Sequence, residues 1–189
     1  MKRHSIVMFA PAALLLAVVT ACSSGTPAAS PTPTKVSSLS LAPAQVKQLV
    51  QQISSKQGEG KEVESASITS YQLQVTANGQ QTQYDLPKDE YFVSIAPYLQ
   101  KTHDCQIHSL TGCQGELTNQ EFVLTITDSS GTIIMNQQKQ VSGDNGFIDL
   151  WLPRNDTYTV KVEQDGKTAE QTISTFANDD TCISTMQLS

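Results

Sequence analysis

The chain is poor in positive charge, in cysteine and in aromatic side chains. Its 189 residues include 12 lysines and arginines against 18 aspartates and glutamates, so no basic excess is available to bind a nucleic acid backbone. Four cysteines are too few for a disulfide-rich scaffold, and the chain must bury an ordinary apolar core. A phosphate-binding glycine loop and internal repeats are also missing. We therefore expect no nucleic acid partner and a single main domain.

The one long apolar run is too short to span a bilayer as a mature helix. Residues 6–19 form 14 uncharged positions after Lys2 and Arg3, a pattern that predicts a secretory signal peptide. The run ends in residues 19–22 (VTAC), which resemble a bacterial lipobox. We therefore expect removal of residues 1–21 and lipidation of Cys22, which would hold the protein at the extracytoplasmic face of the cell membrane. The alternative is an ordinary signal peptide with a chance cysteine.

The next segment lacks a periodic apolar pattern. Residues 23–34 carry three prolines among serine, threonine and alanine, so residues 22–38 are predicted to form a flexible tether behind the lipidated cysteine. Without Lys2 and Arg3 the mature chain has 10 basic and 18 acidic residues, a formal charge of −8. The exported part is distinctly acidic.

The remaining sequence predicts an α+β protein that is mainly β. Residues 46, 49, 50 and 53 are apolar at helical spacing after Pro43, and Asn78-Gly79 between alternating segments indicates a β-hairpin. Residues 39–88 are thus expected to hold a helix and a hairpin. Short alternating segments separated by turn residues then predict a β-sandwich-like domain over residues 89–189, with strands at 91–95, 122–127, 132–135, 147–152, 158–163, 167–173 and 183–188.

If Cys22 carries lipid, three cysteines remain, and three is an odd number. At most one disulfide can form within the monomer, so at least one thiol is left over. Residues 103–113 (HDCQIHSLTGC) hold Cys105 and Cys113 together with His103 and His108, the only histidines outside the signal peptide. Thiolate and imidazole suit Cu(I) or zinc, and thiolate favours Cu(I). This cluster is the strongest functional signal, with copper expected and zinc less favoured.

Two conditions must be met before the cysteines can share a metal. Fully extended, residues 105–113 would hold their sulfurs about 26 Å apart, so the segment must fold back, and Thr111-Gly112 could supply the turn. Cys182, at the start of the last expected strand, can join only if the fold brings that strand beside the loop. Two thiolates could also each give one electron to Cu(II), leaving a disulfide and Cu(I).

Other interpretations remain open at this point. A metal-free thiol-disulfide redox protein is disfavoured because the chain has no Cys-x-x-Cys motif and has acidic residues beside Cys105 and near Cys182. The cysteines could instead form one structural disulfide and one buried inert thiol in an envelope-binding module. Trp151 and Met186 are expected in the core, and Ser109 lacks the surroundings of a hydrolase nucleophile.

Seven short segments also occur in a characteristic order, at residues 94–98 (SIAPY), 102–105 (THDC), 108–110 (HSL), 113–117 (CQGEL), 144–147 (DNGF), 150–154 (LWLPR) and 180–182 (DTC). In this order they resemble the CueP family of bacterial periplasmic copper-binding proteins, over most of residues 65–189. The resemblance implies copper binding, copper resistance and reduction of Cu(II) to Cu(I). In some members it implies delivery of copper to an exported superoxide dismutase.

The resemblance also assigns roles to individual residues. It implies a disulfide between Cys105 and Cys182 and a freer Cys113 that takes part in copper chemistry. A homodimer formed through residues 39–88 is implied too, and a thiol-disulfide oxidoreductase is a candidate partner. A lipid anchor on Cys22 departs from free periplasmic secretion. We therefore expect a lipid-anchored, extracytoplasmic copper-binding protein that uses the three cysteines, with His103 and His108 beside them.

Overall fold

The structure is a computed structural model that describes residues 36–55 and 63–189. The expected signal peptide, the lipidation site Cys22 and most of the expected tether lie outside the described residues. The described residues belong to one compact unit. No helix among the described residues is long and apolar enough to cross a membrane.

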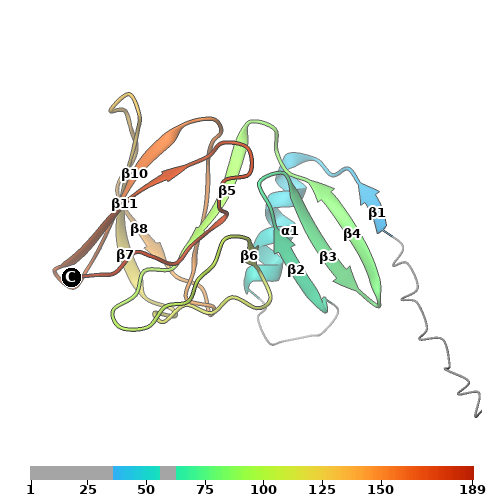
Figure 1. Ribbon diagram of the computed structural model, residues 1–189, viewed down its shortest axis with the longest axis horizontal. Helices are drawn as coiled ribbons and strands as arrows, with labels where there is room; N and C mark the ends of the chain where they lie inside the picture. The colour runs from blue at the N-terminus through green and yellow to red at the C-terminus, as the bar shows by residue number, and fades with distance from the viewer. Residues whose placement is uncertain (1–35, 56–62) are drawn as a thin grey trace, which may run out of the picture. The chain divides into compact units, whose positions relative to one another are not determined.

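The predicted helix is present as α1, Pro43–Ser55 (Figure 1). Proline fits the first helical position because its missing N–H would have no partner there. Two hydrogen bonds between Ala42 and Gln45 cap the N-terminus of the helix. The Gln45 side chain accepts a hydrogen bond from the Ala42 N–H at 3.0 Å, and the Gln45 N–H donates to the Ala42 carbonyl. Val46, Val50 and Ile53 are buried on one face, so the apolar spacing does define the packed side.

The strands of a five-stranded sheet come before and after this helix in the sequence. Its order is β1-β4-β3-β2-β6, with β1 at Val36–Leu39, β2 at Ser65–Ile68, β3 at Gln72–Ala77, β4 at Gln80–Asp85 and β6 at His108–Ser109. The β3–β4 hairpin turns at Asn78 and Gly79, which have φ values of 51° and 69°, as the Asn-Gly pair predicted. Side chains from α1, β2 and β3 share a buried cluster with Phe92 and Leu110.

Two further sheets form the sandwich-like part of the fold. One has the order β11-β10-β7-β8 and the other β12-β5-β9. Their strands are β5 Glu90–Ile95, β7 Glu121–Asp128, β8 Ile133–Val141, β9 Ile148–Pro153, β10 Thr157–Gln164, β11 Lys167–Ser174 and β12 Cys182–Ile183. Residues of both sheets contribute to one core, which includes Tyr91, Phe122, Leu150 and Val160. The expected α+β, mainly β fold is confirmed.

Several strand boundaries differ from the sequence prediction. The last strand was expected over residues 183–188, but β12 ends at Ile183, and Met186 is instead buried in the shared core. Between β2 and β3 the chain turns near residue 70, because the Thr69 hydroxyl accepts hydrogen bonds from the N–H groups of Tyr71 and Gln72. The short strands β1 and β6 carry too few residues to show a pattern.

One close backbone crossing supports the region that contains the cysteines. The Gly115 N–H donates to the Asn145 carbonyl at 2.6 Å. A Cβ on Gly115 would lie 2.6 Å from the Gly146 carbonyl oxygen, and one on Gly146 would lie 2.7 Å from that of Gly115. Only glycine allows this approach, which seats the segment after Cys113 against the turn that leads to Phe147.

Candidate metal centre

The segment from Cys105 to Cys113 folds back on itself, as a shared metal site requires. The N–H groups of Gly112 and Cys113 both donate to the Ser109 carbonyl, at 3.3 and 3.0 Å, and close a turn after β6. Strand β6 itself pairs with β2, with His108 opposite Ile68. The turn therefore forms where the Thr111-Gly112 pair indicated, and it returns Cys113 towards Cys105.

Cys182 reaches this loop through its neighbour Thr181. The Thr181 hydroxyl accepts the His108 N–H at 3.0 Å and donates to the Ile68 carbonyl at 2.6 Å. The N–H groups of Thr181 and Cys182 both donate to the Gln106 carbonyl. Strand β12, which begins at Cys182, also pairs in parallel with β5, and Cys182 lies opposite Ser94 in this pairing. The fold thus brings Cys182 beside a loop that precedes it by about 70 residues in sequence.

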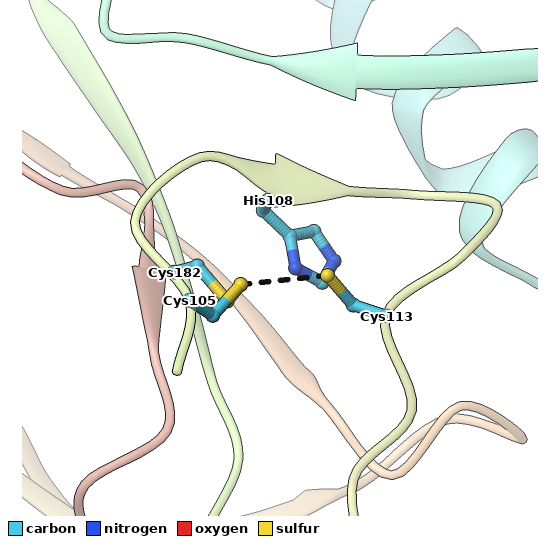
Figure 2. A group of neighbouring side chains, drawn as sticks. All are labelled: Cys105, His108, Cys113 and Cys182. Carbon is cyan, nitrogen blue, oxygen red and sulfur yellow. Dashed lines mark hydrogen bonds between the residues drawn. A yellow bond between two sulfur atoms is a disulfide. The ribbon is translucent and has the colours of Figure 1, made fainter. Parts of the chain in front are cut away.

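Three sulfurs and one imidazole converge at this point (Figure 2). Cys105 and Cys182 are joined by a disulfide, with their Cα atoms 5.5 Å apart. The Sγ of Cys113 lies 3.4 Å from the Sγ of Cys105, and Cys113 carries the one free thiol among the described cysteines. One potential ligand atom from each of Cys105, His108, Cys113 and Cys182 lies within 4.8 Å of all the others.

The sulfur of Cys113 is held in place by the backbone. The Ser109 N–H donates a hydrogen bond to Cys113 Sγ at 3.3 Å. Cys113 is half-buried, and it packs with Cys105 against a small cluster of Ala96, Phe147 and Cys182. The free thiol is therefore fixed beside the disulfide while it keeps some contact with solvent.

His108 is the buried member of the group. Its side chain is 0% exposed, and neither Nδ1 nor Nε2 has a hydrogen-bond partner among the described residues. Its ring lies against Phe147, with the ring centres 4.5 Å apart. Burial lowers the pKa of His108 to about 4, against the opposing effect of the Asp149 carboxylate, so the imidazole is neutral at physiological pH. A neutral imidazole with a free nitrogen can bind a metal ion.

Asp149 links the site to the N-terminal segment. Its carboxylate accepts hydrogen bonds from the Ser94 hydroxyl of β5 at 2.5 Å and from the Ser54 hydroxyl of α1 at 2.8 Å. This negative charge is the main influence that raises the pKa of His108 against the effect of burial. It would also favour a cation bound beside the imidazole.

The other candidate residues lie outside this group. His103 is exposed, and its ring centre lies 6.2 Å from that of Phe147, but it is not among the four converging side chains. Whether His103 binds metal stays a prediction. Trp151 packs against the cluster around α1, and Met186 is 2% exposed in the shared core.

Phe147 and Thr181 form contacts that sequence reasoning did not identify. Phe147 covers His108, and Thr181 connects the β6 loop to Cys182. Both contacts are tertiary, and the position of Thr181 beside Cys182 was the one local signal for either. Periodicity within a strand carries no information about which distant loop it will touch.

The donor set fits a soft metal ion. Thiolate and imidazole are ligands for Cu(I) and for zinc, and oxygen donors are not part of the group. A disulfide sulfur is a poor ligand, so the oxidised form shown in Figure 2 leaves Cys113 and His108 as the available donors. Reduction would add two further thiols in the same place.

The chain is similar to known copper-binding proteins. The family model for the periplasmic copper-binding protein CueP matches residues 48–187. A solved structure described as the crystal structure of S.CueP is 41% identical to the chain, with a TM-score of 0.69. The match covers 76% of this chain and 89% of that one. No curated protein gave a significant match.

The buried imidazole predicts an acid-dependent loss of stability in metal-free protein. The folded pKa of about 4 lies below the ordinary value of 6.5, so the unfolded chain takes up the proton first as the pH falls. The free energy of unfolding should therefore decrease between pH 6.5 and 4, by about 3 kcal/mol from this one group. Urea unfolding with a chelator present, at pH values across that range, measures the effect.

Two substitutions distinguish the contribution of His108 to the pH dependence of stability from the contribution of the carboxylates. In His108→Gln the decrease in stability over this pH range should shrink, whereas His103→Gln should keep most of it, because the charge of His103 is only a minor cause of the lowered pKa of His108. If the free energy of unfolding changed equally with pH in all three proteins, the His108 ring would not stay neutral in the folded state.

Proposed function

The chain belongs to the CueP family of periplasmic copper-binding proteins, and we propose that it binds Cu(I) through Cys105, Cys113, Cys182 and His108. The observation that carries this proposal is the convergence of four soft donors within 4.8 Å. One of them is a buried imidazole whose two nitrogens have no hydrogen-bond partner among the described residues. Buried polar atoms without partners are costly, and a bound metal would satisfy one of them.

The ligand set is proposed to depend on oxidation state. With the disulfide formed, Cys113 and His108 provide one thiolate and one imidazole. With the disulfide reduced, Cys105 and Cys182 add two thiolates to the same group. The aromatic ring of Phe147 and the surrounding apolar side chains limit the access of water to His108, which disfavours oxidation of bound Cu(I) by solutes that reach the site through water.

We further propose that the cysteines reduce Cu(II). Two thiols, Cys105 and Cys182, each give one electron to one Cu(II) ion. The products are one disulfide, two Cu(I) ions and two protons, so electrons and atoms balance. The disulfide between these two residues, 77 positions apart, is the support for choosing them as the electron donors.

Reduced mature protein is predicted to bind Cu(I) in competition with a chromogenic chelator. Replacement of any one of the three cysteines by serine, or of His108 by alanine, should weaken Cu(I) binding by about 100-fold or more. Loss of a residue that only supports a metal ligand already lowers affinity by about 10- to 100-fold, and these residues are proposed to be ligands themselves. The matched control is His103→Asn, at the imidazole outside the group, and its affinity should stay close to wild type. Full affinity in the triple Cys→Ser variant would contradict the proposal.

The redox step is tested separately by counting thiols. Addition of Cu(II) to the reduced protein should produce Cu(I) while two thiols disappear for every two ions reduced. Cys113→Ser should still form the disulfide, whereas the double variant Cys105→Ser/Cys182→Ser should lose this activity, because its one remaining thiol, Cys113, has no partner among the three cysteines of the site. A constant thiol count during Cu(I) formation would contradict the step and leave the binding proposal standing.

Two alternatives make different predictions for the same samples. In a metal-free redox protein, the thiols would exchange with a disulfide substrate and copper would not protect them. In an envelope-binding module with a structural disulfide, the melting temperature would not respond to copper, because a ligand stabilises only a protein that binds it. Zinc is the competing metal for the reduced cysteines, since its ligand preferences overlap with those of Cu(I).

We propose that the mature protein is attached to the membrane through lipid on Cys22. The tether was expected over residues 22–38, but its last three residues, 36–38, form part of β1 and pair with β4. The support is the apolar run followed by small residues and cysteine at residues 19–22. A Cys22→Ser chain expressed in a bacterium should move from the membrane fraction to the soluble extracytoplasmic fraction or keep its signal peptide. Membrane attachment of a Cys22→Ser chain that has lost its signal peptide would contradict the anchor.

Two more parts of the proposal have their support in the family resemblance. One is transfer of Cu(I) to an exported superoxide dismutase, which activation of the metal-free dismutase by the loaded protein would test. The other is dimer formation through residues 39–88. Sedimentation of the mature chain measures that state, and a monomer at all concentrations would contradict it.

A further inference from the structure

The two sulfurs of the disulfide differ in access from the surface. Cys182 is 1% exposed and lies in the small cluster with Ala96 and Phe147. Cys105 is half-buried, and it lines a surface depression of about 450 Å³ together with Asp104, Gln106, Ser184 and Thr185. Cys182 does not line this depression. A reagent that approaches from solvent therefore meets Cys105 first.

We propose that Cys105 is the sulfur at which an incoming thiolate opens the disulfide, and that the depression beside it is where the reductant docks. This inference rests on the redox part of the proposed function, because a protein that reduces Cu(II) with its own thiols must be reduced again before each new turnover. It assigns the entry point for electrons to one of two sulfurs that sequence alone does not distinguish.

The reaction is an ordinary thiol-disulfide exchange with an external dithiol. The first thiolate of the dithiol attacks Cys105 Sγ, a bond forms between these sulfurs, and the Cys105–Cys182 bond breaks. Cys182 leaves as a thiolate and takes a proton. The second thiol of the dithiol then attacks the external sulfur, Cys105 leaves as a thiolate, and the reductant departs as a disulfide. Two electrons and two protons have entered the site.

The direction of this attack has a consequence for metal binding. The sulfur released first is Cys182, which lies within 4.8 Å of Cys113 and His108. Three donors are therefore free in the buried part of the site while Cys105 is still attached to the reductant. Attack on Cys182 would instead require the reductant to enter the cluster beneath Phe147.

Charge at the depression selects the type of reductant. Asp104 is the only charged side chain among the five lining residues, and the mature chain, with 10 basic and 18 acidic residues, has a formal charge of −8. A thiolate with additional negative charge is repelled there, whereas a thiol that carries a positive group is not. The chemistry that fits is a dithiol on a protein with a neutral or basic rim.

The first experiment maps the mixed disulfide on oxidised, metal-free Cys113→Ser protein. In this variant the third thiol cannot rearrange the product, and Cys113→Ala serves if the serine variant does not fold. Glutathione is added in limited amount, the reaction is stopped with acid and remaining thiols are alkylated. Peptide mass spectrometry should find glutathione on Cys105 and an alkyl group on Cys182. Glutathione on Cys182, or in equal amounts on both, overturns the proposal.

The second experiment compares rates of disulfide loss and needs no accumulated intermediate. Asp104→Asn should speed reduction by anionic glutathione roughly threefold at low salt, as expected for removal of one charge on the order of 6 Å from the reacting sulfur. Reduction by cysteamine, which carries an ammonium group, should not accelerate. The matched control is Asp165→Asn in the exposed β10–β11 turn, which should leave both rates unchanged.

Equal rates for the Asp104 and Asp165 variants with glutathione would overturn the assignment of the depression. Neither experiment uses copper, so its outcome is separate from the copper proposals. If these results hold and the protein fails to bind or reduce copper, Cys105 remains the point of reduction of a metal-free disulfide. If copper chemistry is found but glutathione attaches to Cys182, only this inference is wrong.

Discussion

The site depends on one buried crossing at Thr181. Its hydroxyl accepts a hydrogen bond from the His108 N–H of β6 and donates one to the Ile68 carbonyl of β2. Its own N–H donates to the Gln106 carbonyl. Its carbonyl accepts the Ser94 N–H from β5. Three segments, at residues 68, 94 and 106–108, are hydrogen-bonded to this single residue, which is 1% exposed. The next residue is Cys182, so the position of the last sulfur follows from hydrogen bonds that are not themselves part of the metal chemistry.

The same packing creates a polar group that the protein alone does not satisfy. His108 is enclosed by Phe147 and Phe92, and both its ring nitrogens lack partners among the described residues. Each buried unsatisfied polar atom costs on the order of 1–3 kcal/mol. Stability alone would favour an apolar residue in this position. An imidazole held neutral and unpartnered beside three sulfurs is instead what binding of a soft cation requires.

Much of the site was predictable, because its residues are clustered in sequence. The odd number of cysteines and the histidines within residues 103–113 indicated soft-metal chemistry, and the Thr111-Gly112 pair indicated the turn that joins Cys113 to Cys105. The relative placement of His103 and His108 was not predictable. It depends on the pairing of a two-residue strand, β6, with β2, and such a strand is too short to show alternation. The helix and the Asn-Gly hairpin were predictable from local spacing, whereas the end of β12 at Ile183 was not, since an alternating sequence does not show where a strand loses its pairing.

The central claim is that three sulfurs and the His108 imidazole form one copper site. X-ray absorption of the reduced, Cu(I)-loaded mature protein tests it most directly, because the spectrum separates sulfur ligands from imidazole nitrogen. We predict a first shell dominated by sulfur with one imidazole contribution, which is lost in His108→Ala and kept in His103→Asn. A first shell without sulfur, or an imidazole contribution that persists in His108→Ala, would contradict the account.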